Sequence, residues 1–442
     1  MSGFSDTLRR TGVVGAGGAG FPAYVKAGAR AEIVLMNAAE CEPLLHKDIE
    51  LLKTHTETVL AGFALLLKHS GAAKAVIGIK KKHRGTIALL EKAVAAHPAI
   101  TVGQLGDFYP AGDEYCLVYE LTGRRIPPGG IPPDVGVIVN NVETCLNMAQ
   151  DGPVTHTFLT VTGAVRRPAT FRAPIGARFA DLIAAAGGTA IADPAYIDGG
   201  PMMGKVTLDP QTPVTKTTSG IIVLPKTHDL IIRKAADHPV YSRHAKSACD
   251  QCSYCTMLCP RNLLGYNVEP HKVMRSLLFS SAGSRSAASE SGLLCCECSL
   301  CSLYSCPEGL DPRNMCVSAK AELRESGVTV KNSRAAACTG LGVHPMREYR
   351  KTPVSRLVKR LGLEQYKNEA RLTGLPSPIG KVRILLNQHI GTPAVPEITV
   401  GAKVAEGQKI ADVPADKLGV PLHASITGTV TAVTALYIDI ES

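Results

Sequence analysis

Two cysteine runs with repeated spacing restrict the possible folds of this chain more than any other feature of the sequence. The first run is Cys249-x2-Cys252-x2-Cys255-x3-Cys259-Pro260, and the second is Cys295-Cys296-x-Cys298-x2-Cys301-x4-Cys306-Pro307. A C-x2-C-x2-C loop folds three thiolates around one face of a four-iron cluster, while the fourth cysteine, which precedes proline, turns away and ligates the other cluster. The spacing therefore predicts two [4Fe–4S] clusters with crossed ligation. One set is Cys249, Cys252, Cys255 and Cys306, and the other is Cys295, Cys298, Cys301 and Cys259.

The alternative to iron–sulfur clusters is a pair of zinc sites, because C-x2-C repeats also bind zinc. Zinc sites usually combine two C-x2-C pairs across a longer spacer, whereas both runs here are triplets followed by Cys-Pro, which favours clusters. The second run departs from the usual spacing in its x4 gap and in the extra Cys296. Either Cys295 or Cys296 can therefore be the ligand, and the spacing favours Cys295. The scattered cysteines are expected to be buried thiols: Cys41, Cys116, Cys145, Cys316 and Cys338.

Composition narrows the class of protein further. The chain has 442 residues, enough for three or four domains. Its 14 cysteines without a secretory signal favour metal ligation in a reducing compartment, so we expect a cytoplasmic protein. The net charge of +10 is spread along the chain without a nucleic-acid-binding module, so nucleic acid is not an expected partner. The best apolar candidate, Val59 to Leu67, is too short for a transmembrane segment and predicts a buried helix.

The residue patterns predict a multidomain protein that combines α/β and α+β parts. Residues 1–150 alternate strand-like and helical patterns, which predicts an α/β domain. The strands are expected at Ile33–Asn37, Ala75–Ile79 and Val135–Asn140, and the helices at Asp48–Lys68 and Thr86–Ala96.

The rest of the chain divides into four segments. Residues 155–235 predict a small α+β unit with strands at Thr157–Gly163, Ile221–Leu224 and Leu230–Arg233, and one helix, Phe179–Ala186, closed by Gly187 and Gly188. Residues 245–325 hold the cysteine runs, and residues 331–375 read as a basic, structure-poor connector. The tail, residues 376–442, is predicted to be all-β, with strands that include Gly428–Val433 and Leu436–Ile440.

Loops at predicted strand ends indicate a nucleotide site in the first domain. A glycine-dense stretch from Gly12 to Gly20 leads into a helical segment, where backbone N–H groups can approach a phosphate or a flat ring. Carboxylates and amides follow the strands, where ligands of α/β sheets bind. Each of these polar residues taken alone can equally be a helix cap or part of a turn, and a glycine-rich loop can be only a tight turn.

Four motifs together carry a specific resemblance. They are Gly17-Gly18-Ala19-Gly20-Phe21-Pro22, Asn37-Ala-Ala-Glu40-Cys-Glu42-Pro43, Tyr109-Pro-x-Gly112-x-Glu114 and Val139-Asn140-Asn141-Val-Glu143-Thr144. This set resembles the NADH- and FMN-binding subunit family of respiratory complex I and, more closely, the C subunit of the Rnf electron-transport complex. One position departs from the complex I pattern, which has Arg where Ala16 stands.

The later segments extend the resemblance to nearly the whole chain. Residues 155–235, with Asp198-Gly-Gly-Pro-Met-Met-Gly204, look like the SLBB β-grasp domain of the same group. The tail motifs Gln388-His389-Ile390-Gly391 and His423-Ala-Ser425-Ile-Thr-Gly428 look like the barrel-sandwich domain of the Rnf C subunit. In that subunit the barrel-sandwich domain precedes the flavin domain, whereas here it comes last, as in the PduS family of microcompartment cobalamin reductases. The implied fold is a flavin-binding α/β domain, an SLBB β-grasp domain, a helical ferredoxin domain with two [4Fe–4S] clusters and a β barrel-sandwich domain.

The resemblance also implies cofactor contacts, carried over by matching motif positions. The implied FMN contacts are Gly15, Gly17, Gly18, Lys26, Asn37, Glu40, Gly112, Asn140 and Asn141. The implied NADH contacts are Phe21, Glu42 and Glu114.

The function implied by the resemblance is electron transfer from NADH through FMN and the clusters to a corrinoid. An adenosyltransferase and microcompartment shell proteins are the implied protein partners, and a bacterial microcompartment is the implied location. A peripheral Rnf-like subunit that serves membrane partners is the second hypothesis. A non-catalytic iron–sulfur scaffold with a vestigial flavin site is the third.

Overall fold

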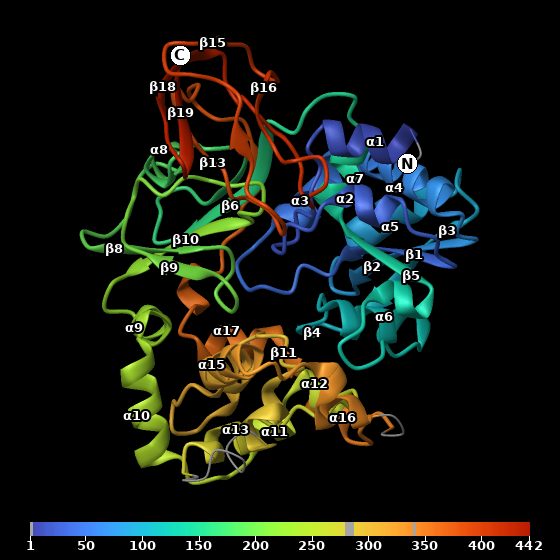
Figure 1. Cartoon of the computed structure of the whole chain (residues 1–442), viewed down its shortest axis with the longest axis vertical. Helices are drawn as coiled ribbons and strands as arrows, with labels where there is room; N and C mark the ends of the chain where they lie inside the picture. Colours follow the sequence, from blue (N-terminus) through green and yellow to red (C-terminus); the bar gives the residue numbers. More distant parts are fainter. Residues whose placement is uncertain (1–2, 279–286, 339–341) are drawn as a thin grey trace.

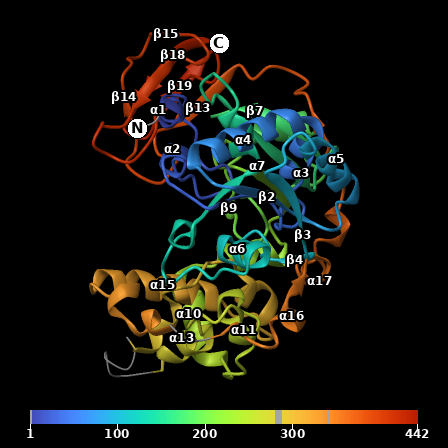
Figure 2. The same ribbon diagram turned by 90° about the vertical axis from the view of Figure 1, so that its right-hand side faces the viewer.

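The computed structural model describes residues 3–278, 287–338 and 342–442. Four units follow one another along the chain, named here the N-terminal unit (residues 3–150), the second unit (155–235), the cysteine unit (245–325) and the C-terminal barrel (381–441). Figures 1 and 2 both place the cysteine unit at one end of the molecule and the C-terminal barrel at the other. Among the described residues, no helix has the length and apolar character needed to span a membrane.

The N-terminal unit is built on a parallel four-stranded sheet in the order β3-β2-β1-β5. The strands are β1 (Ile33–Ala38), β2 (Lys74–Lys80), β3 (Ile100–Leu105) and β5 (Val137–Asn141), and the helices around them are α3 (Lys47–Thr54), α4 (Thr56–Ser70), α5 (Arg84–Val94), α6 (Glu114–Thr122) and α7 (Val142–Met148). Apolar side chains of β1 are fully buried because helices cover both faces of the sheet. The predicted α/β class is confirmed, but the single helix expected over Asp48–Lys68 is wrong, since the chain leaves helical geometry at His55.

The second unit is built on a six-stranded mixed sheet in the order β12-β7-β6-β10-β8-β9. Its strands are β6 (His156–Gly163), β7 (Ala169–Pro174), β8 (Pro194–Asp198), β9 (Lys205–Thr207), β10 (Gly220–Pro225) and β12 (Leu372–Thr373). Helix α8 (Phe179–Ala185) ends at Gly187 and Gly188, which both adopt φ +82°, as the glycine pair predicted.

The strand expected at Leu230–Arg233 is wrong. These residues lie in helix α9 (Asp229–Ala235), where the His228 side chain accepts a hydrogen bond from the backbone N–H of Leu230. Leu230 and Ile231 are buried together, which a helix allows and an alternating strand does not. A short run of β-branched and apolar residues is compatible with either structure, so the sequence pattern alone could not decide.

The cysteine unit is helical, and the C-terminal barrel is all-β, as predicted. The cysteine unit contains α10 (His238–Ala248), which rises toward the second unit in Figure 1, and α11 (Tyr254–Met257), α12 (Pro260–Leu263), α13 (Pro270–Ser276) and α15 (Pro312–Glu325). The barrel consists of a four-stranded sheet, β13-β19-β18-β15, and a three-stranded sheet, β14-β16-β17. These strands are β13 (Lys381–Leu385), β14 (Val395–Pro396), β15 (Lys403–Val404), β16 (Lys409–Asp412), β17 (Leu422–His423), β18 (Gly428–Val433) and β19 (Tyr437–Glu441).

The segment 331–375 is not the structure-poor connector that the sequence predicted. It contains α16 (Arg347–Arg350) and α17 (Val354–Arg360), and it adds β11 (Thr352–Pro353) to β4 (Phe108–Tyr109) and β12 to β7. Val354, Leu357 and Val358 are buried in a core shared with the second unit and the cysteine unit. These elements are too short to produce a periodic pattern, so their structure depends on contacts with distant parts of the chain.

Candidate functional site

The polar residues predicted to bind flavin meet at one edge of the first sheet. In the parallel pairing of β1 and β5, Asn37 lies opposite Asn141 and Met36 opposite Asn140. Strand ends of a parallel sheet share one edge, so both amides reach the loops above it. A Cβ placed on Gly17 would lie 3.4 Å from Asn141 Cβ, and one on Gly112 would lie 3.4 Å from both the amide oxygen and nitrogen of Asn37. The glycine loop and the loop after β4 therefore approach the two strand ends closely.

Two observations at this edge fit a flat, hydrogen-bonding ligand. The Asn140 side-chain nitrogen is buried and, among the described residues, has no hydrogen-bond partner. Gly18 adopts φ +111°, and a Cβ added there would meet no atom within 4 Å, so the loop borders open space at that point. A buried amide donor without a partner carries a desolvation cost that a ligand acceptor would offset. The residues present therefore fit FMN at this edge.

Several predicted residues are already engaged with the protein itself. The Lys26 ammonium donates to Glu114 at 3.1 Å and to the Val139 carbonyl at 2.8 Å. The Glu40 carboxylate accepts from the backbone N–H groups of Asp48 and Ile49. Burial and the neighbouring Asp48 carboxylate raise the pKa of Glu40 to about 8. The structure thus brings Lys26, Glu40 and Glu114 to the site region as parts of its framework, and their cofactor contacts stay predictions.

A buried ion pair beneath the glycine loop was missed. Lys47 donates to Glu143 at 2.9 Å and to the Ala16 carbonyl at 2.9 Å, and both side chains are almost fully buried. The Asn141 amide donates to the Asp48 carboxylate at 2.7 Å, which fixes the orientation of the amide. Glu143 belongs to a motif that the sequence analysis quoted, but only the fold reveals that Lys47 is its partner. This pair holds the glycine loop against helix α7.

Glu42 joins the N-terminal unit to the second unit. Its carboxylate accepts from the backbone N–H groups of Met202 and Met203 at 2.8 and 3.0 Å, and from the Tyr109 hydroxyl at 3.5 Å. A Cβ on Gly200 would lie 2.2 Å from a Glu42 oxygen, so this close approach requires glycine there. Burial raises the pKa of the Glu42 carboxyl. The predicted role of Glu42 in NADH binding stays a prediction, as does that of Phe21, whose carbonyl accepts from the Gly15 N–H.

The C-terminal barrel packs against the glycine loop from the other side. The Ile390 N–H donates to the Gly20 carbonyl at 3.1 Å, and Lys216 of the second unit donates to the Gly12 carbonyl at 2.7 Å. The backbone N–H of Lys216 also donates to the side-chain oxygen of Gln388. Burial lowers the pKa of Lys216 to about 7. Three units of the fold therefore hold the loop that was predicted to carry the flavin.

The first group of cysteines, called group one, consists of Cys249, Cys252, Cys255 and Cys306. All four line one hollow at the surface of the cysteine unit. Cys306 belongs to the second run, so the structure brings it to the three cysteines of the first run. The Gln251 side-chain nitrogen donates to the Cys249 sulfur at 3.1 Å. This grouping supports the crossed ligation, which stays a prediction.

The second group, called group two, consists of Cys259, Cys295, Cys298 and Cys301. Cys259, Cys298 and Cys301 are buried and lie close to one another, and the extra Cys296 lies among them with its side chain hydrogen-bonded to that of Cys298. Across the described residues, no three His, Cys, Asp or Glu side chains gather tightly enough to share a single metal ion. Four thiolates in each group are the donor set that a [4Fe–4S] cluster requires.

The backbone distinguishes between Cys295 and Cys296. Gln251 and Ser253 adopt positive φ values two and four residues after Cys249, and Glu297 and Ser299 do so two and four residues after Cys295. Such left-handed conformations are costly for residues other than glycine and mark a loop shaped around its contents. The positive φ values of the two loops fall at the same offsets only if Cys295 is the counterpart of Cys249. The backbone pattern therefore favours Cys295, whereas the side-chain hydrogen bond to Cys298 comes from Cys296, so the choice of Cys295 as the ligand stays a prediction.

The x4 gap of the second run has a structural explanation. Residues Cys301–Ser305 form a π-helical turn, in which the Cys306 N–H donates to the Cys301 carbonyl at 3.1 Å. A π turn accommodates one residue more than an α turn, and such turns often occur at functional sites. The π turn accommodates the additional residue, and Cys306 still lies with the other three cysteines of group one.

The remaining cysteines are mostly buried, as expected. Cys116, Cys145 and Cys316 are buried and Cys41 is half-buried, while the side chain of Cys338 lies outside what the structure describes. Cys316 is not isolated, since its thiol hydrogen-bonds the Cys295 sulfur and this bond lowers the pKa of Cys295 to about 7.

Direct contacts join group two to the N-terminal unit. The Tyr109 hydroxyl donates to the Cys298 carbonyl at 2.8 Å. Arg261, which follows Cys259-Pro260, pairs with Asp113 at 2.7 Å and stacks on the Tyr115 ring at 3.4 Å. On the side of the N-terminal unit, these contacts come from residues 109–115, the segment that also carries Gly112 at the predicted flavin site. Group two therefore lies on the side of the cysteine unit that faces the flavin edge.

Family models match all four units. A Nuo51 FMN-binding domain matches residues 8–150, an SLBB domain residues 158–206, a 4Fe-4S dicluster domain residues 248–311 and an RnfC barrel sandwich hybrid domain residues 363–442. The predicted cofactor classes, FMN and [4Fe–4S] clusters, are confirmed by these matches, as is the predicted multidomain fold.

Curated relatives match over different extents of the chain. Cobalamin reductase PduS of Salmonella typhimurium is 42% identical over 433 residues, covering 97% of this chain and 94% of that protein. Cobalamin reductase PduS of Citrobacter freundii is 41% identical over 436 residues, with the same coverage. The C subunit of the Na⁺-translocating ferredoxin:NAD⁺ oxidoreductase complex of Acetobacterium woodii is 35% identical over 266 residues, covering 58% of this chain and 57% of that relative.

Proposed function

The chain belongs to the PduS family of cobalamin reductases, and from that premise we propose that it passes electrons from NADH, through FMN and two [4Fe–4S] clusters, to a corrinoid. NADH gives up two electrons and the reduction of Co(III) to Co(II) takes one, so one NADH serves two corrinoids and yields NAD⁺ and a proton. FMN supplies the conversion from a two-electron donor to one-electron carriers when it is bound. We further propose that the protein works inside a bacterial microcompartment, beside an adenosyltransferase that alkylates the reduced cobalt and beside shell proteins.

The contact between Tyr109 and Cys298 carries this proposal. It joins the loops around the flavin edge to the backbone of group two without an intervening layer. The chain's own residues then have separable tasks. Asn37, Asn140 and Asn141 orient the flavin from the strand ends, the glycine loop admits it closely, and the eight cysteines of the two groups hold the clusters. Glu42 and Arg261 keep the three units in register around this path.

NADH-driven reduction of hydroxocobalamin by anaerobically purified protein tests the proposal. The Co(III) absorbance should be replaced by that of Co(II), with flavin and about eight irons per chain retained. Protein in which Cys255 and Cys301 are both replaced by alanine is the control and should lose the brown absorbance and the activity. Protein that releases no flavin fluorescence on denaturation would instead be a scaffold, and recovery in membrane fractions would favour an Rnf-like role.

A further inference from the structure

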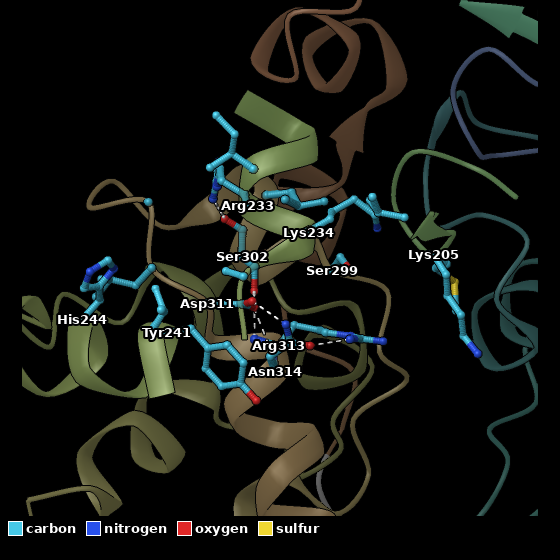
Figure 3. A pocket seen from close by; sticks show the side chains of 18 of the residues that line it. Lys205, Arg233, Lys234, Tyr241, His244, Ser299, Ser302, Asp311, Arg313 and Asn314 are labelled. Carbon is cyan, nitrogen blue, oxygen red and sulfur yellow. Dashed lines mark hydrogen bonds between the residues drawn. The ribbon is translucent and has the colours of Figure 1, made fainter. Parts of the chain in front are cut away.

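A pocket of about 450 Å³ lies where the second unit, helices α9 and α10, and the cysteine unit meet (Figure 3). Residues from β9 and the loop before it form one wall, and residues from α9, α10, the segment 299–303, the loop at 309–311 and the start of α15 form the others. Neither the predicted flavin residues nor the predicted NADH residues line it. The pocket is therefore a separate cavity, and the functional site described above assigns no role to it.

The rim of this pocket is apolar and exposed. Met203, Ile232 and Val240 line it, and their exposed fractions are 53%, 57% and 40%. Large apolar side chains that gather at the mouth of a cavity usually mark a ligand or partner site, because a monomer rarely leaves such a patch uncovered. Leu303 and Leu310 continue the apolar surface inward. The cavity thus suits a ligand with a substantial apolar edge.

The charge around the pocket is positive. Lys205, Arg233, Lys234 and Arg313 line it, and Asp311 is the one carboxylate among the lining residues. Arg233 pairs with Asp229 and Arg313 with Glu297, so the positive charge available to a ligand comes from the two lysines. Figure 3 shows Asp311 turned toward its hydrogen-bond partners, which are the Ser302 hydroxyl and both nitrogens of Asn314. Lys205 is exposed, and the nearest carboxylate with which it interacts is that of Asp198, outside the pocket lining. An anionic group on a ligand would therefore be attracted to this cavity.

The pocket also lies next to the backbone of group two. Ser299 and Ser302, which follow Cys298 and Cys301 of group two directly, form part of its lining. Met203 lines it as well, and the backbone of Met203 is held by Glu42 of the N-terminal unit. A ligand in the pocket would lie next to the backbone of group two.

We propose that this pocket is the docking site of the corrinoid acceptor, an inference that rests on the proposed function. A corrinoid has an apolar macrocycle fringed with methyl groups and amides, and a phosphodiester in its nucleotide loop. The cavity has room for one edge of the macrocycle, with the rest lying over Met203, Ile232 and Val240. Asn314 and Ser299 can meet amides, and Lys205 can meet the phosphodiester. The docked edge then lies beside the residues that follow Cys298 and Cys301.

Equilibrium binding of hydroxocobalamin to the holoprotein, measured without NADH, tests the docking. Ile232→Asp and Met203→Asp should each raise the Kd at least tenfold, because each places a carboxylate on the apolar rim. Val395→Asp, in the C-terminal barrel, where Val395 is 56% exposed, is the matched control and should bind normally. Lys205→Gln should weaken cobalamin binding several-fold and leave binding of cobinamide, which lacks the nucleotide loop, unchanged.

A footprint on the wild-type holoprotein makes the test independent of folding defects in the variants. Bound hydroxocobalamin should slow acetylation of Lys205 and leave that of Lys403, an exposed lysine of the barrel, unchanged. Binding without protection of Lys205, or protection by NADH in place of the corrinoid, would overturn the docking site.

The failure of the site and the failure of the proposed function give different results. If wild-type protein reduces hydroxocobalamin but both rim variants bind and reduce it equally well, the docking site is wrong and the function stands. If wild-type protein reduces ferricyanide with NADH but neither binds nor reduces hydroxocobalamin, the proposed function is wrong, and so is the proposed docking site.

Discussion

The two cysteine groups share one backbone design but have different surroundings. Both triplets place residues with positive φ at the same offsets, so their loops are equivalent. Group one lies at the surface, with Cys252 exposed. Group two is buried against the N-terminal unit, where Tyr109 and Arg261 attach it, and its backbone continues into the further pocket. The same loop geometry thus occurs at a junction between units in group two and at the outer surface of the molecule in group one.

The largest effect is expected from replacing the two cysteines that are predicted to ligate the cluster of the other run. Cys259→Ala should cost the cluster of group two and Cys306→Ala that of group one, since each cysteine lies with the other run's triplet. Each variant should lose between one iron and the four irons of a single cluster, because removal of one thiolate leaves one iron of the cubane without its protein ligand. Iron analysis and EPR of the reduced proteins would measure this.

A variant of Cys296 provides the matched control for that experiment. Cys296→Ser should keep both clusters, whereas Cys295→Ala should lose that of group two. If each crossed substitution disturbed only the cluster of its own run, the grouping seen in the structure would not be the ligand set.

The second test separates the flavin from both groups. Gly17→Val should reduce bound flavin at least tenfold, because its side chain would meet Asn141 in the space the flavin needs. Both clusters should remain, since their ligands lie in another unit. Flavin and iron would be quantified in parallel, with Gly85→Val as the control, because a Cβ at Gly85 meets no atom within 4 Å. Loss of iron together with flavin would mean that the units do not fold independently.

Local patterns made the strands, the glycine loop and the cysteine triplets predictable, because their geometry is determined over a few residues. Asn37 and Asn141 could be placed at one sheet edge because parallel strands end together. The contacts of Glu42 with Met202 and Met203 span about 160 residues of sequence, and no local pattern signals them. The same holds for helix α9 and for the elements of segment 331–375, which form only because distant apolar side chains cover them.

The third test concerns the contact that distinguishes group two. Tyr109→Phe removes the donor to the Cys298 carbonyl, a loss of about 1 kcal/mol. NADH-driven reduction of the clusters should slow several-fold while flavin and iron contents stay normal. Stopped-flow absorbance would follow the rate.

Tyr254→Phe is the control for this substitution. Tyr254 is half exposed and lies between Cys252 and Cys255 of group one. If it slowed cluster reduction as much as Tyr109→Phe did, the two groups would not differ in their connection to the flavin.

The smallest effect is expected from the donor beside group one. Gln251 donates to the Cys249 sulfur at 3.1 Å, and hydrogen bonds to cluster sulfurs stabilise the reduced, more negative state. Gln251→Leu should therefore lower the potential of the group one cluster, by tens of millivolts, without loss of iron. At group two a charged donor from helix α15 lies nearby: the Lys320 ammonium donates to the Cys295 carbonyl at 2.6 Å and to Glu297 at 2.9 Å. Lys320→Met should lower only the group two potential, because it removes a positive charge and leaves Glu297 less compensated. EPR-monitored redox titration resolves the two signals, and a common shift of both signals in either variant would show that the two groups do not have the separate surroundings described here.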